Sequence, residues 1–298
     1  MATFRLTLRL MAFLLGAGIA VGQGAQPEVK TEPLTAAGIM ERVAANQDQG
    51  EALRNEYVYK QHIHIVTHKP GSRIVREETA DYTVKPQPNG TEKQLESLTG
   101  RYWYKGKYVE FQGEQVEGGT DGELVDYLQN HEAMPGGTDA DLVHHLRNSV
   151  SNDGSKDGLG HALFPLTSEE QKQYEFKLLG HEVEAGHNVY HIAFTPVDED
   201  KGRPMWSGEA FIDAAEFQPV RVFTRMSKRI PLLVRATWFD LPGFGFDVVY
   251  KRQEDGLWFP STFGTEFQMR VGPLPIFNRD ISISLENSEF EHTHVETK

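Results

Sequence analysis

Cysteine is absent from the 298-residue sequence. Its absence excludes disulfide bonds, thiolate nucleophiles and thiolate metal ligands. The sequence also lacks a Gly-x-Ser-x-Gly nucleophile elbow, a phosphate-binding glycine loop and the dinucleotide-binding fingerprint. Beyond residue 21, no unbroken apolar run approaches the length of roughly 20 residues that crosses a bilayer as a helix. We therefore expect no catalytic residues of these kinds and no integral membrane protein.

Basic residues are also few. The 30 Lys and Arg stand against 43 Asp and Glu, which gives a formal net charge of −13. A polyanion repels a chain with this charge balance. We therefore expect no nucleic acid partner and no electrostatic binding to anionic lipid headgroups.

The first 22 residues have the pattern of a secretory signal peptide. Arg5 and Arg9 give a positive start, and residues 10–21 form an uncharged run of 12 residues. Ala20 and Gly22 place small residues at the two positions that a signal peptidase reads. An uncleaved anchor is the alternative, but the run is shorter than the roughly 20 residues of a bilayer span. We expect cleavage, a periplasmic location and a flexible lead-in over residues 23–34.

The first half of the mature chain mixes helix and strand patterns. Thr35 is in the right place to cap a helix that reaches about Arg54. Strands are expected over residues 56–67 and 73–84, a break over 86–90, and two short aromatic strands at 102–104 and 108–111. Helical spacing returns over residues 121–131 and 138–150.

From residue 174 to residue 290 the pattern is strand, turn, strand, turn. Apolar and polar side chains alternate, as in Tyr190, Ile192 and Phe194, and turn residues follow at short intervals. No hinge rich in Pro, Ser or Gly divides the chain. We therefore predict an α+β fold that is mainly antiparallel β, with residues 35–298 as a single domain.

Three histidines raise the possibility of a metal site. His62, His64 and His68 share one parity on an expected strand, so adjacent members could point the same way and share an ion. The other interpretation is a solvated polar face, because this parity opposes Ile63 and Ile65. No acidic ligand has a matching register nearby, so we assign no metal ligand. A metal-assisted hydrolase that uses these histidines is kept as an alternative function.

The apolar face of the expected sheet is unusually aromatic. Such a face must be covered by closure, by a second sheet or by helices. A few helices over a concave sheet could leave a gap wide enough for an acyl chain, whereas a filled core would suit an envelope interaction scaffold. We predict no catalytic residue and no cofactor. The predicted ligand-binding residues are the inward side chains Tyr190, Ile192, Phe194, Phe244, Phe246, Phe263 and Phe267.

The order of these elements resembles the LolA-like lipoprotein-sorting proteins of the bacterial periplasm. An export signal precedes a helix and a Tyr-Val-Tyr strand, and a long meander with a Gly-x-Trp-x-Pro strand follows. The stretches that carry the resemblance are residues 37–43, 57–59, 174–182, 190–196, 208–213, 219–222 and 256–260.

The resemblance implies an incomplete, half-open β-barrel whose concave apolar face is covered by helices. It also implies a carrier or sensor without cofactors that binds acyl chains of lipoproteins or lipids. Inner- and outer-membrane envelope proteins would be its partners. The matching motifs are structural, so the resemblance assigns no site residue.

Overall fold

The computed structural model describes residues 34–71, 73–87, 90–113, 137–150, 165–197, 206–226, 239–240, 244–271 and 277–293. Residues 34–298 belong to one compact unit and residues 1–33 to another. The expected signal peptide over residues 1–22, the lead-in up to residue 33 and the helix over 121–131 lie outside the described residues.

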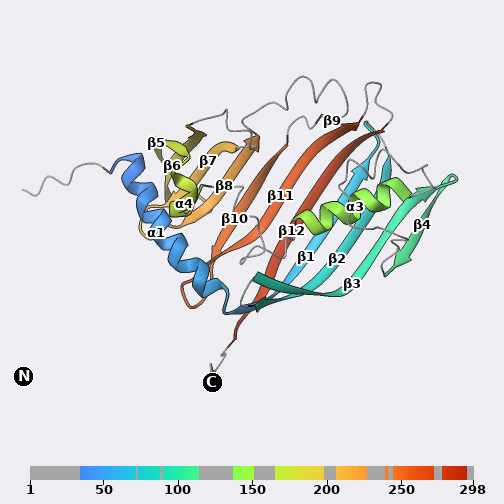
Figure 1. The fold of residues 1–298 in the computed structure, drawn as a ribbon, viewed down its shortest axis with the longest axis horizontal. Helices are drawn as coiled ribbons and strands as arrows, with labels where there is room; N and C mark the ends of the chain where they lie inside the picture. The colour runs from blue at the N-terminus through green and yellow to red at the C-terminus, as the bar shows by residue number, and fades with distance from the viewer. Residues whose placement is uncertain are drawn as a thin grey trace, which may run out of the picture. The chain divides into compact units, whose positions relative to one another are not determined.

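One antiparallel sheet of 12 strands dominates the described part of the chain. Its order is β4-β3-β2-β1-β12-β11-β10-β8-β7-β6-β5, with β9 paired to β11 beside this path (Figure 1). The strands are β1 (Tyr57–His68), β2 (Ile74–Gln87), β3 (Gly90–Tyr104), β4 (Lys107–Gln112), β5 (Tyr174–Glu184), β6 (His187–Pro196), β7 (Trp206–Asp213), β8 (Pro219–Met226), β9 (Phe239–Asp240), β10 (Gly245–Arg252), β11 (Trp258–Val271) and β12 (Phe277–His292).

The sheet joins two meanders through the pairing of β1 with β12. Strands β1 to β4 follow one another on one side of this junction, and β5 to β12 form the other side. Within the described residues β4 and β5 are the two edges and do not pair with each other, so the sheet remains open. The predicted class, mainly antiparallel β in a half-open barrel, is confirmed.

Cross-strand register aligns the apolar side chains on one face. Ile63 lies opposite Leu285, which lies opposite Phe263 on the next strand. Directly opposed residues of an antiparallel pair point to the same face. We call this side, which carries the buried apolar residues, the inner face. His62 and His64 have the opposite parity and lie on the outer face.

Helix α1 (Ala36–Arg54) covers part of the inner face at the β5 end. Thr35 caps it as predicted, because its Oγ1 accepts a hydrogen bond from the Gly38 N–H at 3.1 Å. Ile39, Met40 and Val43 are buried on one side of α1. The helix also contacts the short helix α4 (Ser168–Gln171), which begins with a capping box between Thr167 and Glu170.

Helix α3 (Gly137–Val150) covers the other half of the sheet. It packs against β1 and β2 and buries Leu142 and Val143 in the same core (Figure 1). Together α1, α3 and α4 provide the helical cover that was expected for the apolar face.

One expectation about the strands was wrong. The chain does reverse within residues 86–90, between Gln87 of β2 and Gly90 of β3, but the short strand expected at 102–104 is only the end of the 15-residue strand β3. The first part of β3 has few apolar residues, so alternation could not indicate it. Polar contacts between strands hold it instead, including Lys60 Nζ to Glu96 Oε1 at 2.5 Å and Ser97 Oγ to Asp81 Oδ2 at 2.5 Å.

Candidate functional site

An aromatic cluster lies on the inner face and includes side chains of β7, β10 and β11, with β8 between β7 and β10. Trp206 contacts Phe244 and Phe246, with ring centroids 5.5 and 5.0 Å apart. Phe244 lies 4.9 Å from Phe246 and 4.8 Å from Phe267, and Phe246 lies 5.0 Å from Phe263. Edge-to-face and tilted pairs at these separations stabilise one another beyond the area that they bury. The cluster therefore forms a continuous apolar surface across three strands.

The structure brings the seven predicted ligand-binding residues into one core. Ile192, Phe194, Phe246, Phe263 and Phe267 are buried core residues, and Tyr190 and Phe244 pack against them partly exposed. Four of the seven, Phe244, Phe246, Phe263 and Phe267, also belong to the aromatic cluster just described. Whether these side chains bind a ligand stays a prediction.

Trp206 was not among the predicted site residues, although it contacts two of them. It is the first residue of β7, so no preceding apolar residue of that strand could reveal its parity. Ala210 and Ile212 on the same strand are buried and share its parity, which was the available signal. Tyr174 also joins this region, with its ring centroid 5.9 Å from that of Phe194.

The inner face is covered by the protein itself. Phe246, the most exposed of the five core residues, is only 8% accessible. One described pocket, of about 510 Å³, includes Phe267 and Ile281 together with polar residues near the β1–β2 turn. The other six predicted ligand-binding residues line neither this pocket nor the larger one on the outer face. An acyl chain would therefore have to displace side chains or a helix to reach the cluster.

Charged side chains hold α3 against the inner face. Glu78 of β2 is buried and accepts hydrogen bonds from Arg147 Nη1 at 2.5 Å and from Arg76 Nη2 at 3.0 Å. Near the start of α3, Asp139 forms a bidentate pair with Arg279 of β12, at 2.6 and 2.7 Å. Buried pairs of this kind cost several kcal/mol to break, because the remaining charge has no compensation.

Further titratable groups lie on α3. Burial raises the pKa of Asp141, and the nearby charges of His145, His144 and Arg76 oppose this effect. His144 also contacts Arg147, with its Nδ1 3.1 Å from Arg147 Nη2. The cover over the β1–β2 half of the sheet is therefore held by charge as well as by apolar packing.

His62 and His64 on the outer face do not belong to a metal site among the described residues. In the described part of the chain, no group of three His, Cys, Asp or Glu side chains comes together in a way that could hold an ion. His62 Nδ1 lies 2.7 Å from Asp81 Oδ1, and His64 Nε2 lies 3.0 Å from Glu77 Oε1. Hydrogen bonds from Ser97 and His62 lower the pKa of Asp81. The expectation that no acidic residue has a matching register nearby was therefore wrong, because strand pairing places Asp81 directly opposite His62.

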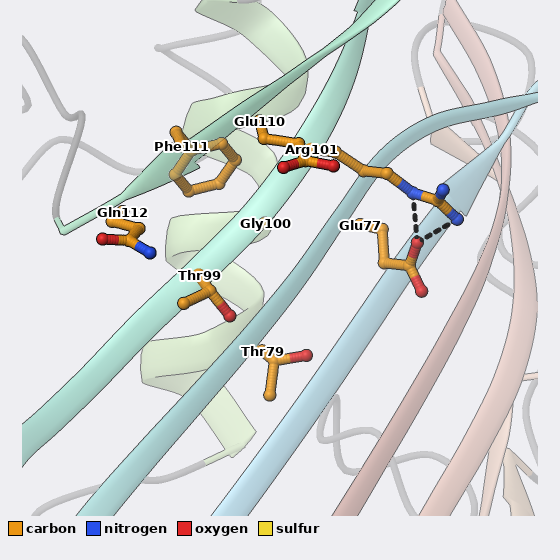
Figure 2. A pocket seen from close by; sticks show the side chains of 8 residues that line it. All are labelled: Glu77, Thr79, Thr99, Gly100, Arg101, Glu110, Phe111 and Gln112. Atoms are coloured by element: carbon orange, nitrogen blue, oxygen red, sulfur yellow. Dashed lines mark hydrogen bonds and ion pairs between the residues drawn. The ribbon is translucent and has the colours of Figure 1, made fainter.

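A second pocket lies over β2, β3 and β4 and has a volume of about 790 Å³. Figure 2 shows its lining, in which the Arg101 guanidinium pairs with Glu77 at 2.6 Å. Burial opposes ionisation of Glu77, but hydrogen bonds from His64 and Arg101 outweigh it and lower the pKa. The remaining lining residues are Thr79, Thr99, Gly100, Glu110, Phe111 and Gln112. This mostly polar lining does not suit an acyl chain.

No described helix combines the length and the apolar character that a bilayer span requires. No family model and no curated protein matches the sequence.

Three bacterial proteins are among the solved structures that align with this chain. A DUF1329 family protein from Desulfovibrio piger aligns with a TM-score of 0.39 and 10% identity, over 89% of this chain and 96% of its own. A domain described as outer membrane lipoprotein-sorting from Vibrio parahaemolyticus aligns with a TM-score of 0.37 and 12% identity, over 87% of this chain and 95% of its own. The LolA superfamily protein NE2245 from Nitrosomonas europaea aligns with a TM-score of 0.32 and 14% identity, over 87% of this chain and 94% of its own. The structures that align with this chain thus include one named for the LolA superfamily and one named for lipoprotein sorting.

Proposed function

We propose that this protein is a non-enzymatic carrier or sensor of the periplasm that binds acyl chains of lipids or lipoproteins. The observation that supports the proposal is the aromatic cluster of the inner face, which lies in one apolar core with the inward side chains of α1 and α3. The N-terminal pattern of residues 1–22 supports export. Envelope proteins that deliver or receive the ligand would be its partners.

Apolar area provides the binding free energy in this proposal. Burying a methylene group contributes about 0.8 kcal/mol, so a chain of roughly ten methylenes could gain on the order of 8 kcal/mol. Part of this gain is used to move the covering elements, because the core residues are already packed in the ligand-free protein. Affinity therefore depends on how easily the cover opens.

A matched pair of substitutions tests this proposal. Phe246 on β10 faces inward, whereas Phe223 on the neighbouring strand β8 lies opposite Asp247 on the outer face. We expect Phe246→Asp to abolish uptake of a fluorescent fatty acid and Phe223→Asp to leave it within about twofold, with far-UV circular dichroism unchanged in both. Phe263→Trp, which adds bulk without charge, should also weaken uptake. Equal uptake by the inner and outer variants would refute the assignment.

The close burial of the core residues also favours a second candidate, an envelope interaction scaffold with a filled core. The two candidates differ in what the purified protein contains. Native mass spectrometry of protein taken from the periplasm should detect a bound lipid for the carrier and protein alone for the scaffold.

A further inference from the structure

Two hairpin turns lie together at one end of the sheet. One turn connects His68 of β1 to Ile74 of β2, and Lys105-Gly106 connect β3 to β4. Arg76 of β2 lies opposite both Thr67 of β1 and Tyr102 of β3, so the two turns extend beyond the same end of these strands. We call residues 69–73 and 101–108 the basic tip. Figure 1 shows the β3–β4 hairpin at the edge of the sheet.

The charge of the basic tip is opposite to that of the chain. Its basic residues are Lys69, Arg73, Arg101, Lys105 and Lys107, and it contains no acidic residue, whereas the whole chain carries −13. Glu77 compensates Arg101 through their ion pair. The other four basic residues are exposed, so the positive charge of the tip faces solvent.

Aromatic rings lie among these cations. Trp103 and Tyr108 pack edge to face with ring centroids 5.0 Å apart, and Tyr108 is 39% exposed. The Arg73 guanidinium lies 4.1 Å from the centre of the Trp103 ring, and Lys105 Nζ lies 5.0 Å from that of Tyr104. Trp and Tyr beside Lys and Arg are the side chains that proteins place at the boundary between lipid headgroups and water.

The β3–β4 turn holds these side chains in place before any partner binds. Lys105 and Gly106 both have positive φ, at 45° and 89°, and the flanking Tyr104 and Lys107 are paired. Two positive φ angles in a two-residue loop are the signature of a type I′ turn, which matches the twist of the flanking strands. Docking through this hairpin therefore costs little ordering entropy.

We propose that the basic tip docks the protein on an anionic phospholipid surface. This proposal departs from the expectation based on net charge. Charges separated by more than about 8 Å are screened at physiological salt, so a membrane surface interacts mainly with the charges nearest to it. The Trp and Tyr rings fit the headgroup region, a role that an acidic protein partner would not require. This inference goes beyond the proposed function and does not depend on an acyl site.

A charge-reversed variant and a matched control test the proposal. Lys69→Glu/Lys107→Glu changes one exposed lysine near each turn, and Lys177→Glu/Lys251→Glu makes the same charge change at two exposed lysines elsewhere. Binding is measured by sedimentation with phosphatidylcholine vesicles that contain 0 or about 30 mol% phosphatidylglycerol, at roughly 0.15 M salt. Each lysine contributes a factor of about five to affinity, so we expect the tip variant to bind at least about 30-fold more weakly.

The control should bind within about threefold of the unmodified protein, and the Lys69→Gln/Lys107→Gln variant should lie between the two. Trp103 emission, measured with the other tryptophans replaced by Phe, should shift to shorter wavelength when anionic vesicles are added. The proposal is overturned if the protein does not bind anionic vesicles, if neutral vesicles bind it equally well, or if both Glu variants lose the same affinity. Uptake of a fluorescent fatty acid, which tests the proposed function, should be unchanged in the tip variant.

Discussion

The buried carboxylate of Glu78 connects helix α3 to the sheet through Arg147. Glu78 lies between Arg76 and Arg147 and is 3% exposed. Replacing it with Gln preserves the shape but removes the carboxylate charge that both buried guanidinium groups contact. Breaking a buried pair in this way costs about 3–5 kcal/mol. We expect a loss of that size in the free energy of unfolding for Glu78→Gln.

The neighbouring residue on β2 provides the control. Glu77 also pairs with an arginine, Arg101, but on the outer face, where the Arg101 side chain is 42% exposed. An exposed pair contributes about 0–1 kcal/mol, so Glu77→Gln should lose no more than that.

Urea unfolding measures the difference between the two variants if each unfolds in a single transition with the same slope. Hydrogen exchange in α3 should also become faster in Glu78→Gln, because Arg147 holds this helix to the sheet through Glu78. If the two variants lose the same stability, the argument that Glu78 compensates two buried charges is refuted.

Two further predictions follow from the β2–β3 region. A Cβ at Gly100 would meet the Glu77 carbonyl oxygen and lie 2.5 Å from the Phe111 ring, whereas one at Gly264 meets nothing within 4 Å; Gly100→Ala should therefore lose about 1–3 kcal/mol of stability and Gly264→Ala almost none, as thermal unfolding can measure. Acid should also weaken this region, because the pKa values of Glu77 and Asp81 are lowered from 4.5 and 3.8 in the folded protein. Their contribution to stability is complete at pH values above the unfolded pKa values and is lost as the pH falls through the lowered ones. The thermal unfolding midpoint should therefore decrease once the pH is below about 4.5, and this decrease should be less steep in Asp81→Asn. Equal losses in the two alanine variants, or a midpoint that does not change between pH 5 and pH 3, would contradict these predictions.

The sequence predicted those helices and strands whose own residues show a cap or a regular hydrophobic period. Thr35 and the stripe of Ile39, Met40 and Val43 indicated α1, and alternation such as that of Tyr190, Ile192 and Phe194 indicated the meander strands. A hydrophobic period is local, so it can be read without knowing which strands are neighbours.

The sequence did not predict features that depend on register. Glu78 and Arg147 are 69 residues apart, and nothing local indicates that a carboxylate on β2 compensates an arginine on α3. The basic tip also combines two segments that only strand pairing brings together. The first half of β3 was missed because few of its own residues are apolar, so its sequence shows little alternation. Charged residues on the inner face and polar strands therefore required the structure.

The most direct test of the acyl-binding account is the fluorescence of Trp206. This side chain contacts Phe244 and Phe246 in the aromatic cluster, whereas Trp103 lies in the basic tip. Two single-tryptophan variants, one with only Trp206 and one with only Trp103, are titrated with a nitroxide-labelled fatty acid below its micelle concentration. The account predicts saturable quenching of Trp206 and little change in Trp103. Fatty acid that binds without quenching Trp206, or quenches both equally, would contradict it.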